Sequence, residues 1–266
     1  MGKYNTNDNG ILGKVLLLIR IICIIVIIVC LVYIIRWYME NKKNAAMLSE
    51  LTDNSVKDTI VIELPHNNDD NIEEEPVKIQ VYELDFDKLF SVNRNTVGWI
   101  TVPGTSINYP VAQAQDNGFY LNHSFDNSKN TAGWIFADYR NKFDGTDRNI
   151  IIYGHNRVDT SMFATLKNTQ KANWYNNSNN KYISFVTPSG TQIYETFSVY
   201  TIQMESYYIQ TDFDSDAEYL NFLNTLKSRS VHDFGTKISS DDKIITLSTC
   251  DSTGKSRVIL HAKKIM

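Results

Sequence analysis

The sequence predicts a mainly β domain that follows an N-terminal transmembrane helix. Two observations support this prediction. A nearly continuous apolar run, Val15–Ile35, lies close to the start of the chain. From about residue 80, short strand-like segments follow one another, and each is bounded by Gly, Pro, Asn or Asp. With 42% hydrophobic residues, the chain can bury a sizeable core.

The predicted membrane anchor covers residues 15–36. At about 1.5 Å per residue, the apolar run crosses a hydrocarbon core of roughly 30 Å. Arg20 lies near the start of the span, where its stem can snorkel, and Trp37 and Tyr38 lie where an aromatic belt would end it. A cleaved signal peptide is the alternative, but the run is longer than a usual signal-peptide core and no clear cleavage site follows it.

The orientation of the anchor is inferred from residues 1–14, because the positive charges on the two sides of the span nearly balance. A short basic tail before a first span usually stays in the cytoplasm. We therefore expect a single-pass membrane protein with residues 40–266 outside the cell. An exported domain usually pairs its cysteines, but Cys23 and Cys30 lie inside the span. Cys250 is then an unpaired thiol and a candidate for chemistry.

Residues 37–79 are predicted to form a juxtamembrane helix and an acidic linker. The segment "MENKKNAAMLSEL" can continue as a short polar helix, whereas residues 52–76 are rich in acids and contain two prolines. Such a stretch cannot bury enough apolar area to offset its ordering entropy. We expect a solvated tether, with the compact domain covering residues 80–266.

Three helices are expected in the compact domain, over Asp85–Asn93, Thr160–Thr169 and Ser215–Arg229. The third carries a broad aromatic stripe, which we interpret as core packing. Eight strands with few helices indicate a barrel or a sandwich. The predicted strands are Gly98–Val102, Ile107–Val111, Gly133–Ala137, Asn149–Tyr153, Tyr182–Thr187, Gln192–Gln203, Lys243–Thr249 and Arg257–Lys263.

Cys250 ends the segment "KIITLSTC". Period-two alternation puts Ile244, Thr246, Ser248 and Cys250 on one face of this strand. The following "DSTGK" has the composition of a turn, and "SRVILHAKK" runs as the next strand. If the two strands pair as a hairpin, Arg257 opens the second strand beside the end of the first, so thiol and guanidinium are neighbours.

A cysteine nucleophile also needs a proton carrier. The candidate is His155 in "NIIIYGHN", which ends a hydrophobic strand after Gly154, a residue whose backbone freedom lets the next side chain be aimed into a cleft. The other histidines are His66 in the tether, His123 and His232 in polar loops, and His261 on the final strand. From position alone, a structural role remains open for each of the five.

Together these segments resemble the sortases, the membrane-anchored cysteine transpeptidases of Gram-positive bacteria. "TLSTC" looks like the family's Thr-Leu-X-Thr-Cys motif, with an arginine opening the next strand, and "YGH" matches the segment that carries the family's histidine. The segments "DFDKLFSVNRNTVGWITVPGTSINYPV", "DNGFYLNHSF", "GWIFADYRN" and "YIQTDF" followed by a helix are similar to class B sortases. The resemblance runs from about residue 83 to the end.

The resemblance implies an eight-stranded sortase β-barrel with an N-terminal helix and a long helix before the penultimate strand. It also implies that Cys250 attacks the threonine carbonyl of a C-terminal sorting signal, that His155 is the general acid and base, and that Arg257 holds the substrate carbonyl or oxyanion. An arginine suits that role because it stays charged and offers forked donors. The implied groove residues are Asn117, Leu121, Tyr153, Tyr208, Ile209, Ser248 and Asp251.

The implied partners are surface proteins bearing a C-terminal sorting signal, a peptidoglycan precursor that supplies the accepting amine, and the membrane through residues 15–36. No nucleic-acid partner is expected, because the net charge is −4 and the basic residues are scattered among acids. No metal and no cofactor are expected, because the sequence contains no HExxH, no paired cysteines and no EF-hand spacing.

Two other functions compete with this interpretation. A papain-like cysteine peptidase would place its cysteine early in the chain with histidine downstream, the reverse of the order found here. A non-catalytic binding or pilus-assembly module would leave Cys250 inert.

Overall fold

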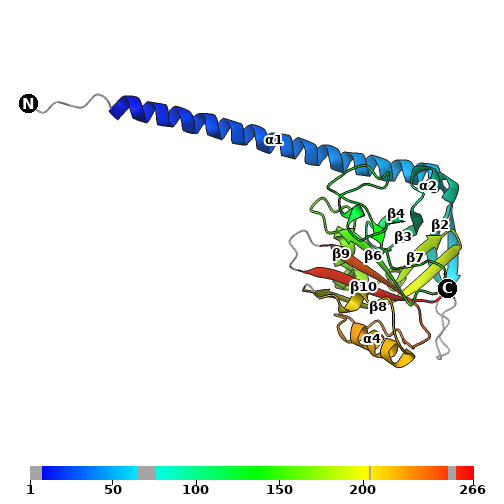
Figure 1. Ribbon diagram of the computed structural model, residues 1–266. Coiled ribbons are helices and arrows are strands. Elements are labelled where there is room, and N and C mark those ends of the chain that lie inside the picture. The colour runs from blue at the N-terminus through cyan, green and yellow to red at the C-terminus, as the bar shows by residue number, and fades with distance from the viewer. Residues whose placement is uncertain (1–7, 65–75, 204, 251–255) are drawn as a thin grey trace, which may run out of the picture. The chain divides into compact units, whose positions relative to one another are not determined.

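A computed structural model describes residues 8–64, 76–203, 205–250 and 256–266 of the chain. Contacts divide the chain into two compact units, Met1–Ala45 and Ala46–Met266. The first helix, α1, spans Asp8–Ser55 and is labelled in Figure 1. Its apolar side chains from Leu12 to Met39 are exposed, and by length and composition the helix can cross a membrane. The predicted anchor, residues 15–36, lies within it.

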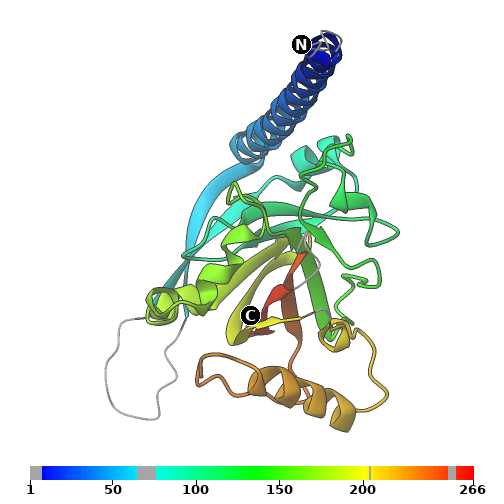
Figure 2. The same ribbon diagram turned by 90° about the vertical axis from the view of Figure 1, so that its left-hand side faces the viewer.

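The second unit contains a closed β-barrel in the order β10-β8-β7-β3-β4-β5-β6-β9, which confirms the eight-stranded prediction (Figures 1 and 2). Neighbouring strands are antiparallel except for two parallel pairs, β4 with β5 and β6 with β9. The strands are β3 Thr96–Thr101, β4 Asn108–Gln113, β5 Phe136–Ala137, β6 Asn149–His155, β7 Tyr182–Thr187, β8 Gly190–Ile202, β9 Ile244–Cys250 and β10 Arg257–Lys264. Each overlaps a predicted strand, and β5 is shorter than the predicted Gly133–Ala137.

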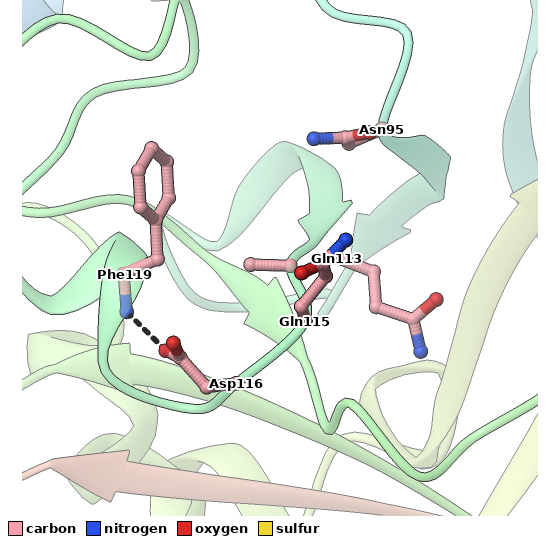
Figure 3. A pocket seen from close by; sticks show the side chains of 6 residues that line it. Asn95, Gln113, Gln115, Asp116 and Phe119 are labelled. Carbon is pink, nitrogen blue, oxygen red and sulfur yellow. Dashed lines mark hydrogen bonds between the residues drawn. The ribbon is translucent and has the colours of Figure 1, made fainter.

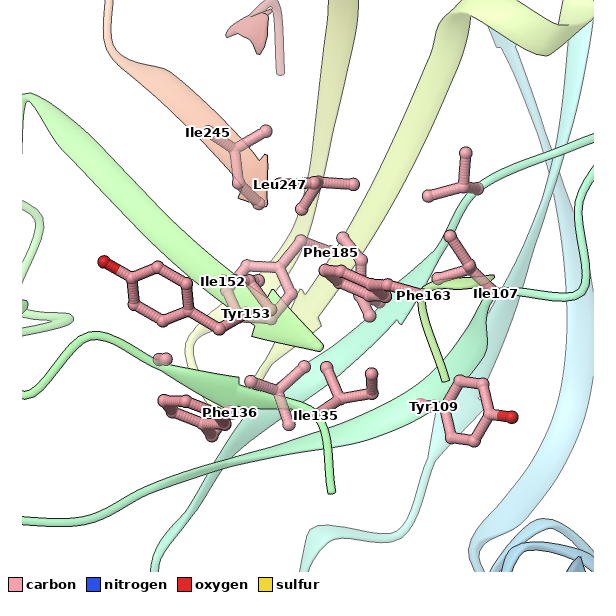
Figure 4. Close-up of a cluster of buried hydrophobic side chains, with 14 of the residues drawn as sticks. Ile107, Tyr109, Ile135, Phe136, Ile152, Tyr153, Phe163, Phe185, Ile245 and Leu247 are labelled. Atoms are coloured by element: carbon pink, nitrogen blue, oxygen red, sulfur yellow. The ribbon is translucent and has the colours of Figure 1, made fainter. Parts of the chain in front are cut away.

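The barrel interior is filled by branched and aromatic side chains from almost every strand (Figure 4). On β9, Ile245 and Leu247 point into this cluster, whereas Ile244 belongs to a second cluster formed with helix α4, Asp216–Ser228. The alternation predicted for this strand is therefore confirmed, although both faces are buried. Figure 2 shows α4 beside the barrel strands.

Helix α4 begins at its N-cap Ser215, whose hydroxyl accepts a hydrogen bond from the Glu218 amide, and carries acids in its first turn. Its aromatic stripe packs in the second cluster, as predicted, but Leu220, expected on that stripe, is exposed. The first predicted helix is confirmed as α2, Phe86–Val92.

The prediction of a helix over Thr160–Thr169 is wrong in both the type of helix and the residue at which it begins. A 3₁₀ helix, η2, covers Ala164–Gln170 instead. Thr160 and Met162 have φ angles of 63° and 55°, in the left-handed region, so a right-handed helix cannot begin there. The described residues also form the short helices η1 Phe119–Leu121, α3 Ala172–Tyr175, η3 Ser178–Lys181 and η4 Tyr207–Ile209.

The prediction of a solvated tether over residues 52–76 is wrong for the first half of that segment. Helix α1 continues to Ser55, and β1, Val56–Leu64, then pairs with β2, Val77–Leu84, as an antiparallel hairpin. Alternate β2 residues, Val77, Ile79 and Val81, are buried against barrel residues. The apolar residues of "TIVIEL" gain a strand partner that composition alone could not reveal. Residues 65–75 lie outside the described part of the chain.

Candidate active site

The parallel pair β6 and β9 brings the predicted histidine and cysteine together. Its register runs from Asn149 opposite Ile244 to His155 opposite Cys250. Because parallel strands run in the same direction, both residues end their strands at the same edge of the barrel. The backbones of residues that are distant along the chain are thereby direct neighbours.

Arg257 opens β10, which runs antiparallel to β9 on the other side. The pairing between them runs from Lys263 opposite Ile244 to Ile259 opposite Ser248, and Arg257 begins β10 two residues before this last pair, at the end where β9 reaches Cys250. The Val258 amide donates to Thr249 Oγ1 at 2.8 Å, which ties the two strands together at this end. The predicted antiparallel pairing is confirmed, and the turn, with Asp251, lies outside the described residues.

The imidazole of His155 is half-buried and oriented by the backbone of the η1 segment. Its Nε2 lies 2.8 Å from the carbonyl oxygen of Leu121. A carbonyl oxygen can only accept, so Nε2 carries the proton of the neutral ring. Nδ1 is then the nitrogen that can take up a proton.

Gly154, just before the histidine, is required by close packing. A Cβ at this position would lie 2.5 Å from Ile135 Cδ1 and 2.6 Å from Phe163 Cγ. Its φ angle is not positive, so the backbone freedom expected from the sequence is not the reason for this glycine. Gly133 has a φ of +62°, and a Cβ there would lie 2.8 Å from His155 Cδ2. Gly133 thus lets the chain pass close to the imidazole, and Gly154 lets β6 pack against Ile135 and Phe163.

Tyr208, in the short helix η4, Tyr207–Ile209, joins Arg257 to β9. Arg257 Nη1 donates to the Tyr208 hydroxyl at 3.0 Å, and that hydroxyl lies 3.0 Å from Ser248 Oγ. Tyr208 and Ser248 are both fully buried. The structure thus brings two predicted groove residues into contact around the guanidinium, where they support its position.

A buried carboxylate, Asp138, collects two further predicted groove residues. Tyr153 Oη and Asn117 Nδ2 each donate to Asp138 Oδ2 at 2.9 Å. Arg140 donates two hydrogen bonds to the same carboxylate, from Nε to Oδ1 at 2.8 Å and from Nη2 to Oδ2 at 2.7 Å. Arg140 Nη2 also donates to the Ile209 carbonyl oxygen at 2.9 Å.

Sequence reasoning missed Asp138 and Arg140, although the segment that contains them, "ADYRN", was among those carrying the family resemblance. A usable signal was an acid at the end of a buried strand followed closely by an arginine.

Burial alone would raise the pKa of Asp138, but hydrogen bonds from Arg140, Tyr153 and Asn117 outweigh it and hold that pKa below its ordinary value. Burial and the neighbouring Asp138 charge raise the pKa of Tyr153. Asp138 therefore stays ionised while Tyr153 stays a hydrogen-bond donor.

The other described histidines are held in structural roles. His261 is fully buried, with Nε2 2.9 Å from the Tyr200 hydroxyl and Nδ1 2.9 Å from Thr246 Oγ1. Burial lowers its pKa to about 3, so it stays neutral near pH 7. His123 stacks on Phe119, and His232 donates through Nε2 to the Gln170 carbonyl oxygen. His66 lies outside the described residues.

A pocket of about 500 Å³ lies on the segment that leads toward Leu121 (Figure 3). None of the predicted site residues lines it. The close-up shows Phe119 above the Asp116 carboxylate, which accepts a hydrogen bond from the Phe119 amide at 2.9 Å. The lining residues are Asn95, Gln113, Ala114, Gln115, Asp116 and Phe119.

Comparison with known families identifies the domain. The family model described as "Sortase domain" matches residues 100–265. "Sortase B" of Listeria monocytogenes is 39% identical over 182 residues, which cover 66% of this chain and 72% of that protein.

Solved structures agree with the family match. Sortase B from B. anthracis in complex with AAEK1 superposes with a TM-score of 0.70 at 33% identity, over 85% of this chain and 98% of that chain. A "Staphylococcus aureus sortase B-substrate complex" and a sortase B complexed with triglycine each give a TM-score of 0.64 at 37% identity over 68% of this chain, and over 84% and 85% of their own chains.

Proposed function

This chain belongs to the sortase family and is a cysteine transpeptidase of the sortase B type, and we propose that Cys250, His155 and Arg257 carry its chemistry. The observation that supports this most directly is the parallel register that makes His155 the direct partner of Cys250. The papain-like alternative needs a helix to carry its cysteine, whereas Cys250 ends a strand.

In the proposed first half-reaction, His155 Nδ1 has taken the proton of the Cys250 thiol, and the Cys250 thiolate attacks the carbonyl carbon of the threonine in a bound sorting signal. The carbonyl electron pair moves onto oxygen, and Arg257 stabilises the oxyanion with its fixed positive charge. As the intermediate collapses, the amide bond breaks and His155 donates a proton to the leaving nitrogen. The product is a thioacyl enzyme and a released C-terminal peptide.

In the second half-reaction, an amine attacks the thioacyl carbon and His155 accepts its proton. The new amide bond forms and the Cys250 thiolate leaves, which restores the starting state. We propose that a cell-wall peptidoglycan amine is the acceptor. The sortase B complex with triglycine supports a glycine-type amine for this role.

We propose that α1 anchors the protein in the membrane through residues 15–36, with residues 1–14 in the cytoplasm and the barrel unit outside the cell. The exposed apolar side chains of α1 support the anchor. Because β1 and β2 pair with each other and β2 packs on the barrel, we assign the hairpin to the catalytic domain instead of to a linker. Protease added to intact cells should digest the barrel unit and spare the tail.

The experiment that tests the chemistry uses the full chain in detergent, a set of fluorescence-quenched sorting peptides and triglycine. Wild type should cleave at least one peptide, give a thioacyl adduct mapped to Cys250 by mass spectrometry, and form a glycine-linked product. Peptides with Asn-Pro-X-Thr-Asn and Pro-X-Thr-Gly patterns identify the signal that is read. Unchanged cleavage by Cys250→Ala would reject the proposal.

A further inference from the structure

We propose that Asp138 and Arg140 are positioning residues that hold together three separate segments of the peptide groove, and that they thereby set the affinity for the sorting signal. This inference rests on the function proposed above. Its basis is geometric: one buried carboxylate and one guanidinium connect the Asn117 loop, strand β6 and helix η4.

The Asp138 carboxylate is saturated by donors. It is fully buried and accepts from the Arg140 amide at 3.0 Å as well as from the Arg140 fork, Tyr153 and Asn117. Both carboxylate oxygens are thereby engaged, which is what a buried charge requires. Such a group costs desolvation free energy, and a well-packed apolar residue could replace it in a barrel that needed only stability.

The donors belong to segments that carry the proposed site. Tyr153 lies on β6 two positions before His155, and Asn117 precedes the Leu121 segment whose carbonyl oxygen orients the His155 ring. Asn117 is held at its other end too, because its Oδ1 accepts from the Tyr139 amide at 3.0 Å. A shift of Asp138 would therefore move both the β6 side and the Asn117 side of the groove.

Arg140 extends the connection to helix η4. Its Nη2 binds the Ile209 carbonyl oxygen, directly after Tyr208, whose hydroxyl contacts Arg257. Asn149 Nδ2 supports the same segment through the carbonyl oxygens of Tyr208 at 3.3 Å and Gln210 at 2.9 Å. The backbone carbonyl oxygens of residues 208–210 are thus held by the side chains of Arg140 and Asn149.

Arg140→Lys is the decisive variant. Lysine keeps the charge opposite Asp138, but it cannot bind both carboxylate oxygens and the Ile209 carbonyl oxygen with one planar fork. Loss of a charge-assisted hydrogen bond in a shielded site should raise the KM for the sorting peptide by roughly tenfold. Asp138→Asn should raise the KM to a similar extent. The amide NH₂ of asparagine is itself a donor, so it cannot accept the hydrogen bonds that Tyr153 and Arg140 donate to the carboxylate.

The control is Glu195→Gln, which neutralises a partly buried carboxylate of β8 in an ion pair with Lys181 of η3. Its KM should stay at the wild-type value. All four proteins are assayed as full chains in detergent, after circular dichroism has established that each is folded at the assay temperature. If Asp138→Asn does not fold, Arg140→Lys alone decides.

Alkylation of Cys250 by iodoacetamide separates positioning from general structural support. The rate of alkylation depends on the thiol and the imidazole, and it does not require a bound peptide. For Arg140→Lys, its rate and pH profile should match wild type while the peptide KM rises. An unchanged KM, or a parallel loss of alkylation and peptide turnover, would overturn the positioning role. Absence of peptide cleavage and of a Cys250 adduct in wild type would instead refute the proposed function.

Discussion

Strand β9 has a histidine on each side, and the two are in opposite environments. At its end, Cys250 is paired with His155 of β6; four residues earlier, Thr246 is paired with His261 of β10. His155 is half-buried, and a backbone carbonyl oxygen orients its ring. His261 is fully buried, and both of its ring nitrogens face hydroxyl groups.

The difference shows that burial, more than strand position, decides which histidine can transfer protons. Desolvation disfavours the imidazolium, and it lowers the pKa of His261 to about 3, far from the working range of a general base. A histidine at the edge of the barrel keeps access to substrate and solvent. The same strand thus has a partly accessible imidazole beside its end and a fixed polar network at its centre.

The largest effect is expected at His155. His155→Gln keeps a polar side chain but removes the proton carrier, so kcat/KM for peptide cleavage should fall by roughly 10³-fold. His123→Gln is the control, because His123 stacks on Phe119 and is not paired with β9. Peptide cleavage kinetics measure both variants. A loss of tenfold or less, taken as about the scale of one hydrogen bond, would show that His155 is not the proton carrier.

Arg257→Lys should have the next largest effect. The charge remains but the planar fork is lost, so kcat should fall by about a hundredfold while the protein stays folded. Arg148→Lys is the matched control, since Arg148 forms its ion pair with Asp216 at the start of α4. Single-turnover acylation with a sorting peptide gives the measurement. Equal acylation rates in the two variants would contradict the oxyanion role.

Tyr208→Phe should have a smaller effect on turnover. It removes the hydroxyl that contacts both Arg257 and Ser248, and a loss of roughly tenfold in kcat/KM is expected. Tyr219→Phe matches it in burial and in hydroxyl contacts, which go to the Arg148 and Asp242 carbonyl oxygens near α4. The control should lose stability without losing activity. Similar activities would mean that Tyr208 does not support the guanidinium.

His261→Gln should leave the cleavage rate near pH 7 unchanged, the smallest catalytic effect of the four. Its signature lies in the pH dependence of stability. The pKa of His261 is about 3 in the folded protein and about 6.5 in the unfolded chain, so only the unfolded chain binds this proton between those values. The free energy of unfolding should therefore fall by about 1.4 kcal/mol for each unit that pH drops below about 6.5.

Urea unfolding of wild type and His261→Gln between pH 6.5 and 4.5 checks this slope in a range where most carboxylates remain ionised. The variant should lose this part of the pH dependence even if its absolute stability is lower. An identical slope in both proteins would mean that His261 titrates in the folded state, and the contrast with His155 would then fail.

Several elements were predictable because their signals are local. The turn residues between apolar segments marked the strands, and the acid-rich first turn with a broad apolar stripe marked α4. The family resemblance singled out Cys250, His155 and Arg257 from short motifs, and the structure pairs the backbones of His155 and Cys250 and begins the neighbouring strand β10 at Arg257. Their catalytic roles stay a prediction until the variants above are measured.

Other features depended on partners far away in the chain. The segment Val56–Leu64 looked like part of a tether because its strand partner, Val77–Leu84, follows a long acidic stretch. Thr160 and Met162 broke an expected helix through backbone angles that their residue types rarely adopt. Gly154 was singled out for its flexibility, but Ile135 and Phe163 leave no room there for a side chain.

The sequence by itself determined the apolar run of α1 and the strand series, since these follow from composition and periodicity along the chain, and its resemblance to the sortases singled out Cys250, His155 and Arg257. Only the tertiary structure decided that β6 and β9 run parallel with His155 beside Cys250, and that Asp138 and Arg140 together bind three separate segments. The physical reason is that strand pairing and buried-charge satisfaction are long-range: each is fixed by the residues that come close in space once the barrel closes.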